Sequence, residues 1–217
     1  MKKNIFVIAP ILFFILASCS GTDGSSASEI IRNTGKISGI LGFFLIGLSI
    51  FVGSTSRFFD KYFGLEKILR FHKTFTFISF VILLFHPFLI NISNILDGTF
   101  ANIVDYLTVY QYIFGVISFV FFACVVVISY FYFKKINFLL WITFHRITII
   151  SYFLAFIHIQ FFAVLSLDNA FLKILIYSGL MLAISGALSR IIIMIVKKKR
   201  YGKVIENVME TSDVYSI

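Results

Sequence analysis

Long apolar segments alternate with short polar ones along most of the chain. A helix needs about 20 mostly apolar residues to cross a bilayer, and five segments meet this requirement: 34–54, 71–90, 107–133, 139–162 and 171–196. They are too long for strands, and no ten-residue alternating pattern indicates a β-barrel. Because short segments separate them, the helices are expected to pack as antiparallel neighbours.

The N-terminal segment allows two interpretations. Residues 4–18 are apolar and follow two lysines, and a box resembling a lipoprotein cleavage site ends at Cys19. The segment is either a first transmembrane helix that tolerates Pro10, or a cleaved signal followed by a polar tether at 21–28. The expected fold class is therefore an all-α integral membrane bundle of six helices, or of five if the segment is cleaved.

Three regions follow from this pattern. Residues 1–33 are the N-terminal helix or signal with its tether, residues 34–200 are the transmembrane domain, and residues 201–217 are a tail. Within the transmembrane domain, residues 57–70 mix charges with Phe, Tyr and Leu. This mixture predicts an amphipathic helix on the cytoplasmic surface of the membrane.

The composition excludes an ordinary soluble domain. Hydrophobic residues make up 59% of the 217 residues and charged residues 13%, against typical values of about 45–50% and about 25%. A soluble protein of this size cannot bury so much apolar side chain. The lipid bilayer is therefore the expected solvent for most of the chain.

The net charge of +9 is explained by membrane topology. Basic residues cluster at 57–73, 134–146 and 197–203, whereas 91–107 and 163–170 contain no Lys or Arg. This alternation is typical of the positive-inside rule, and it argues against nucleic acid as a partner. The predicted location is the cytoplasmic (inner) membrane of a bacterium, with several passes and a cytoplasmic C-terminus.

The four histidines lie in two of the apolar segments. His72 and His86 are 14 residues apart, about 21 Å along a helix, and His145 and His158 are 13 apart, about 19–20 Å. Both helices run outward by the charge rule, so His72 matches His145 in depth and His86 matches His158. The 13-residue step turns about 140° away from the first face, so that helix must tilt, distort or use different rotamers.

Two pairs at matching depths favour two stacked haems, each with two axial histidines. The sequence contains no C-x-x-C-H, so b-type haem is expected rather than covalently attached c-type haem. Two alternatives stay open. A histidine inside a membrane can serve as polar contact between helices, or the set can line a proton or metal pathway in a transporter without haem.

The two histidine segments resemble the membrane domain shared by ferric reductases and NADPH oxidases. The resemblance covers about residues 34–200 and lies in the 14 and 13 spacings, the His-Lys and His-Arg pairs and Trp141. It implies that His72 and His145 hold an inner haem and that His86 and His158 hold an outer haem. It also implies electron transfer to ferric iron or dioxygen outside, and it favours a retained N-terminal helix.

Full-length members of that family continue into flavin- and nicotinamide-binding domains. Residues 201–208 resemble the first strand of the flavin domain, but the sequence has no G-x-G-x-x-G. FAD and NAD(P)H are therefore not expected to bind this chain, which would be an oxidoreductase component served by a cytoplasmic flavin reductase or split dehydrogenase subunit. Alternatively, it is similar to the haem-binding membrane partner of a periplasmic methionine sulfoxide reductase.

Other residues near the histidines are weaker candidates. Lys73 and Arg146 follow the inner histidines, and Arg190 lies deep in the last segment. All three could bind inner haem propionates, although Lys73 and Arg146 equally suit anchoring at the membrane surface. Tyr152 and Phe80 lie midway between the two haem levels, where either could fill the gap between haems or simply pack.

Overall fold

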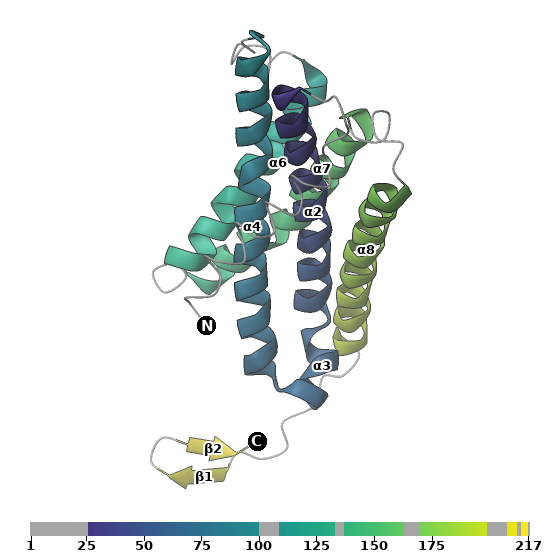
Figure 1. The fold of residues 1–217 in the computed structure, drawn as a ribbon. Helices are drawn as coiled ribbons and strands as arrows, with labels where there is room; N and C mark the ends of the chain where they lie inside the picture. Colours follow the sequence, from purple (N-terminus) through teal and green to yellow (C-terminus); the bar gives the residue numbers. More distant parts are fainter. Residues whose placement is uncertain are drawn as a thin grey trace.

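The structure is a computed structural model that describes residues 26–99, 109–132, 137–162, 170–198, 208–211 and 214–216. The elements, labelled as in Figure 1, are α2 (Ala27–Ser54), α3 (Ser56–Phe63), α4 (Leu65–Leu96), α6 (Tyr110–Val127), the π-helical turn η1 (Ile128–Tyr132), α7 (Phe138–Phe162), α8 (Ala170–Lys198), β1 (Val208–Thr211) and β2 (Val214–Ser216). The N-terminal apolar segment 4–18 lies outside the described residues.

Within the described ranges, five helices are long and apolar enough to cross a membrane, namely α2, α4, α6, α7 and α8. This confirms the prediction of a helical, multi-pass membrane protein. The described part of the tail is an antiparallel hairpin in which β1 pairs with β2. Most of the stretch expected to form a first flavin-domain strand, residues 201–207, is outside the described residues.

Several helices begin earlier than the apolar pattern predicts. The first described helix begins at Ala27 rather than residue 34, because the Ser26 side chain caps it by accepting a hydrogen bond from the Glu29 N–H at 3.2 Å. The boundary expected between residues 33 and 34 therefore falls inside α2. The segment 57–70 is not one amphipathic helix, since Gly64, at φ +80°, ends α3 and α4 starts at Leu65.

Helix α2 is at the centre of the bundle. It packs against α4 on one side and α8 on the other, while α6 and α7 pack together and lie inclined behind them (Figure 1). Small residues allow the close approach: a Cβ on Gly42 would lie 3.1 Å from Leu83 of α4, and one on Gly186 would lie 2.9 Å from the Phe51 Cα. The buried core joins α2, α6, α7 and α8 through residues such as Ile40, Phe122, Ile159 and Ile176.

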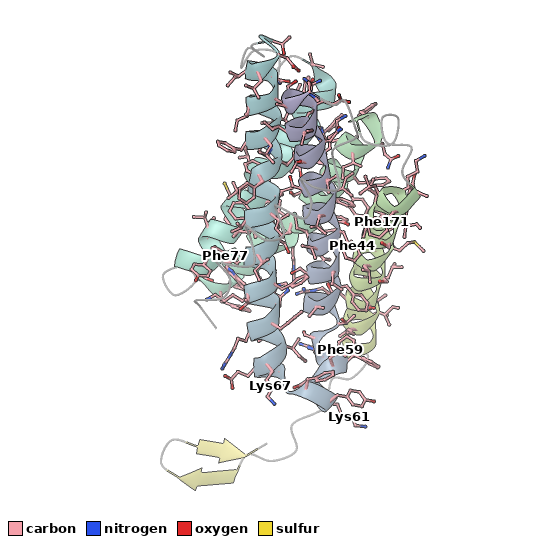
Figure 2. The ribbon with its side chains drawn as sticks, in the orientation of Figure 1. Phe44, Phe59, Lys61, Lys67, Phe77 and Phe171 are labelled. Atoms are coloured by element: carbon pink, nitrogen blue, oxygen red, sulfur yellow. The ribbon has the colours of Figure 1, made fainter. Side chains whose placement is uncertain are left out.

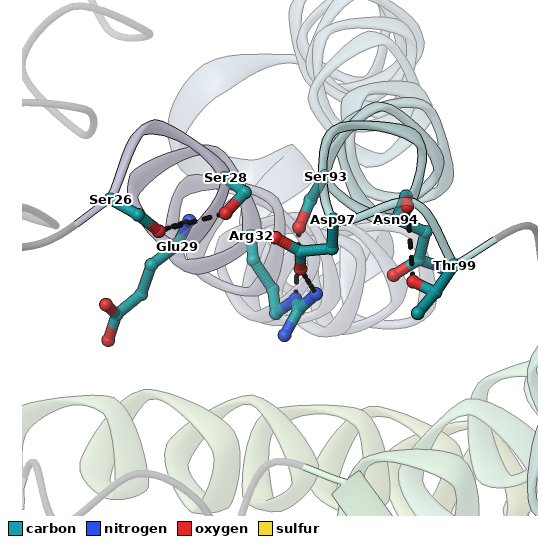
Figure 3. Close-up of polar contacts among 8 residues, drawn as sticks. All are labelled: Ser26, Ser28, Glu29, Arg32, Ser93, Asn94, Asp97 and Thr99. Carbon is teal, nitrogen blue, oxygen red and sulfur yellow. Dashed lines mark hydrogen bonds and ion pairs between the residues drawn. The ribbon is translucent and has the colours of Figure 1, made fainter.

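The two ends of the bundle differ in chemistry. Figure 2 shows Lys61 and Lys67 together at the end that carries α3, where Phe58 and Tyr62 are also exposed. At the opposite end, Arg32 joins α2 to α4 (Figure 3): its Nε donates to the Ser93 hydroxyl at 3.0 Å and its guanidinium pairs with Asp97. This contact fixes the register of α2 against α4.

Candidate functional site

The structure brings the four histidines together as two pairs between α4 and α7. The ring centroids of His72 and His145 are 6.0 Å apart, with ring planes at 74°. Those of His86 and His158 are 6.3 Å apart, with ring planes at 75°. The first pair lies toward the α3 end of the bundle and the second toward the opposite end.

The separation within each pair matches what a shared metal ion requires. A histidine nitrogen binds a metal ion at about 2.0–2.1 Å, and the ring centre lies about 1.2 Å behind that nitrogen, so histidines on opposite sides of one ion have centroids about 6.4 Å apart. The observed 6.0 Å and 6.3 Å are close to this value. Each pair could therefore hold one ion between its two rings.

The ligand count distinguishes haem iron from a free metal ion. Among the described residues, no group of three or more His, Cys, Asp or Glu side chains is placed to hold a metal ion. A protein site for a bare ion such as zinc usually supplies three or four ligands. Haem iron needs only axial ligands because the porphyrin occupies the other positions. Two histidines per site therefore fit haem iron better than a free ion.

Helix α2 orients the two histidines of α4. The Nδ1 of His86 lies 2.9 Å from the Gly35 carbonyl oxygen, and the Nδ1 of His72 lies 3.0 Å from the Ser49 carbonyl oxygen. A carbonyl can only accept, so each Nδ1 carries the proton and donates it. The lone pair then resides on Nε2, the nitrogen left to bind a metal ion.

The two histidines of α7 are held by other means. Trp141 stacks on His145 with centroids 5.0 Å apart and planes at 23°, and its indole N–H donates to Ser129. The His145 Nδ1 has no hydrogen-bond partner among the described residues. The His158 ring lies on Gly115 of α6, where a Cβ would come 2.7 Å from Nδ1.

Arg190 connects the first histidine pair with two further arginines. Arg190 is partly buried. It lies within electrostatic range of the positive charges of Arg146 and Arg57, and also of the His145 side chain. The two ion pairs found among the described residues, Arg32–Asp97 and Arg70–Glu66, include none of these three arginines. We call Arg57, Arg146 and Arg190 the arginine cluster. It has the charge to bind an anionic group, and the sequence had not indicated Arg57.

Lys73 does not join this cluster. Its ammonium lies over the Tyr130 ring, 4.7 Å from the centroid, in a cation–π contact between α4 and η1.

The two aromatic candidates lie in the packed interior. Tyr152 is 3% exposed and stacks on Phe43 at 4.2 Å, with its hydroxyl between Gly47 of α2 and Gly179 of α8. That hydroxyl has no hydrogen-bond partner among the described residues. Phe80 packs against two phenylalanines of α6. Both residues therefore contribute to the packing between helices.

Sequence reasoning missed most of the groups that orient the histidines. Gly35 and Ser49 act through backbone carbonyls, to which Ser49 adds its hydroxyl, and Gly39, Gly53 and Gly115 act through the absence of a side chain. None of these residues has a side chain that binds metals, so only the 14-residue spacing of Gly39 and Gly53 could have attracted attention.

A family model described as "Ferric reductase like transmembrane component" matches residues 38–156. The matched range contains three of the four histidines, while His158 lies two residues beyond it. No curated protein and no solved structure gives a significant match to the chain.

Proposed function

The chain belongs to the ferric reductase-like transmembrane component family, whose model matches more than half of its length, and on this premise we propose that it carries electrons across a membrane through two b-type haems. Domains of this family generally bind haem. In this proposal His72 and His145 would hold an inner haem, and His86 and His158 would hold an outer haem. The observation that carries it is the pair of centroid distances, 6.0 Å and 6.3 Å.

Bound haem would supply the one-electron redox chemistry through its iron. The chain's own residues supply position and environment. The Nε2 atoms of His72 and His86 point away from the carbonyls that fix their Nδ1 protons. Apolar residues between the two levels, such as Phe43 and Phe122, exclude water from the path.

The arginine cluster supports the placement of the inner haem. A haem carries two propionate groups, and Arg is suited to bind carboxylates with two parallel hydrogen bonds. Arg146 and Arg190 would bind the inner propionates, with Arg57 as a third positive charge. A partly buried Arg inside a membrane needs an anionic partner, and Arg190 has none in the ion pairs of the described residues.

The charge distribution gives the orientation of the chain in the membrane. We place the α3 end in the cytoplasm, because Lys61, Lys67 and Arg70 are exposed there. This basic face also suits an acidic electron donor. The donor we propose is a separate cytoplasmic flavoprotein, which would bind the FAD and NAD(P)H that this chain is not expected to bind. The acceptor, by family resemblance, is ferric iron or dioxygen at the outer haem.

The proposal is tested by measuring the haem-to-protein ratio and the reduced-minus-oxidised spectrum of the purified protein. We expect two b-type haems per wild-type chain and one in His86→Ala, with loss of the outer haem. His72→Ala should lose the inner haem instead. Gln160→Ala is the matched control, since it removes a polar side chain of α7 two residues from His158 and should keep both haems.

Two results would contradict the proposal. A wild-type protein without a Soret band would show that the histidine pairs do not hold haem. An unchanged haem content in both His86→Ala and His72→Ala would refute the assignment of ligands.

A further inference from the structure

Helix α2 contacts the two histidines of α4 through the same two backbone features at two levels, a carbonyl oxygen and a glycine. At the outer level the Gly35 carbonyl accepts the proton of His86 Nδ1, and a Cβ on Gly39 would lie 2.7 Å from that nitrogen. At the inner level the Ser49 carbonyl accepts from His72, and a Cβ on Gly53 would lie 3.0 Å from its Cε1. The inner level also has the Ser49 hydroxyl, 3.1 Å from the same His72 nitrogen, which the outer level lacks. Each level thus has a carbonyl at one residue and a glycine four residues later. We call this unit a carbonyl–glycine cradle.

The four-residue offset has a physical reason. In an α-helix the carbonyl of one residue points toward the N–H of the residue four positions later, so the side chain at that later position lies beside the oxygen. The same chain illustrates this: the Thr34 hydroxyl donates to the Ile30 carbonyl, and the Thr55 hydroxyl to the Phe51 carbonyl. A donor from a neighbouring helix can reach such an oxygen only if the later residue leaves the space open. Glycine does so.

The spacing of the cradles equals the spacing of the histidines. Gly39 and Gly53 are 14 residues apart on α2, as are His86 and His72 on α4. The contacts between the two helices follow one register, in which Gly39 faces His86, Gly42 faces Leu83 and Gly53 faces His72. A step along α2 is therefore matched by an equal step backwards along α4. The Arg32–Asp97 ion pair at the outer end holds this register (Figure 3).

We propose that α2 is the positioning helix for both haems, and that its two carbonyl–glycine cradles set the orientation and protonation of the α4 axial ligands. The cradle fixes the proton on Nδ1 and lays the ring against α2, so Nε2 faces α7. This inference rests on the proposed function, because the orientation of Nε2 matters only if it binds haem iron. Gly39 and Gly53 are positioning residues that touch neither iron nor substrate.

The cradles predict effects that are specific to one haem. In Gly39→Ala the new Cβ would be 2.7 Å from His86 Nδ1, too close for the ring to keep its place. We expect this variant to hold one haem per chain, with loss of the outer one. In Gly53→Ala the conflict is milder, at 3.0 Å. We expect two haems, with a shifted low-spin ferric EPR signal for the inner haem alone.

Gly42→Ala is the matched control. Its Cβ would lie 3.1 Å from the Leu83 Cβ, nearly as close as the 3.0 Å contact of Gly53→Ala. Both changes are on α2 and face α4, but that of Gly42 involves no histidine. It should keep two haems and both wild-type EPR signals. His86→Ala and His72→Ala provide the reference spectra of chains that lack one haem. Gel filtration in detergent checks that each variant is folded.

The outcomes separate this inference from the proposed function. If the wild type holds two haems and Gly39→Ala and Gly42→Ala lose equal amounts of haem, the cradles act only through ordinary helix packing. This result would overturn the inference and leave the proposed function standing. Wild-type EPR signals for both haems in Gly39→Ala would overturn it as well. A wild type without haem would overturn the proposed function first, and the inference with it.

Discussion

Replacing Tyr152 with Phe should stabilise the protein. The Tyr152 ring is 3% exposed, and its hydroxyl has no hydrogen-bond partner among the described residues. A buried polar group without a partner costs about 1–3 kcal/mol of stability. Phe removes that group and keeps the stacking on Phe43, which lies 4.2 Å away with planes at 14°. The small void left by one oxygen atom offsets only part of the gain.

A change of about 1 kcal/mol moves the melting temperature of a chain of this size by about 2–4 °C. We therefore expect Tyr152→Phe to melt a few degrees higher in detergent, with two haems and unchanged spectra. Tyr177→Phe is the control, since Tyr177 of α8 is 45% exposed. A lower melting temperature in Tyr152→Phe, with Tyr177→Phe unchanged, would show that the Tyr152 hydroxyl makes a stabilising bond and would refute the reasoning.

Three further predictions concern the other contacts around the histidines. Trp141→Leu removes the ring stacked on His145, and the His145 Nδ1 has no acceptor in the described chain that could hold the imidazole instead. The EPR signal of the inner haem should therefore broaden, while that of the outer haem should stay unchanged. In the proposed function the positive charge of Arg190 would favour the reduced iron of the inner haem, so Arg190→Gln should lower the midpoint potential of that haem in a redox titration. Lys173→Gln, at the other end of α8, should leave this potential unchanged. Ser118→Ala deletes the hydroxyl that donates to the Ser151 carbonyl at 2.8 Å, so the free energy of unfolding should fall by about 1 kcal/mol. Ser185 is exposed, and Ser185→Ala should leave the free energy of unfolding unchanged.

The apolar pattern located the membrane-crossing part of each helix but not its ends. Hydropathy reports where lipid surrounds the chain, and α2 and α4 extend beyond that region on polar residues. α2 gains residues 27–33 because Ser26 caps it, and α4 gains residues 65–70 because Gly64 interrupts the amphipathic segment. Capping and a positive φ are local backbone properties, and a sliding average of hydropathy does not contain them.

The spacing of the histidines carried information on depth, and the structure adds the contacts that orient each ring. Depth follows from the rise of the helix, so matching His72 with His145 and His86 with His158 needed only the charge rule and residue counts. The orientation of the rings depends on backbone atoms of α2. A carbonyl oxygen is common to every residue, so no residue type marks Gly35 or Ser49 as an acceptor for histidine.

The 13-residue step in α7 shows how helix packing completes what spacing leaves open. His145 and His158 face directions about 140° apart on an ideal helix, whereas the cradles of α2 hold His72 and His86 on nearly one face of α4. Figure 1 shows α7 inclined to α4, so different flanks of α7 approach α4 at the two levels. The supports differ accordingly: Trp141 of the same helix backs His145, and Gly115 of α6 backs His158. Helix α4, held in register by α2, therefore sets the two levels, and the inclination of α7 brings each partner ring to about 6 Å.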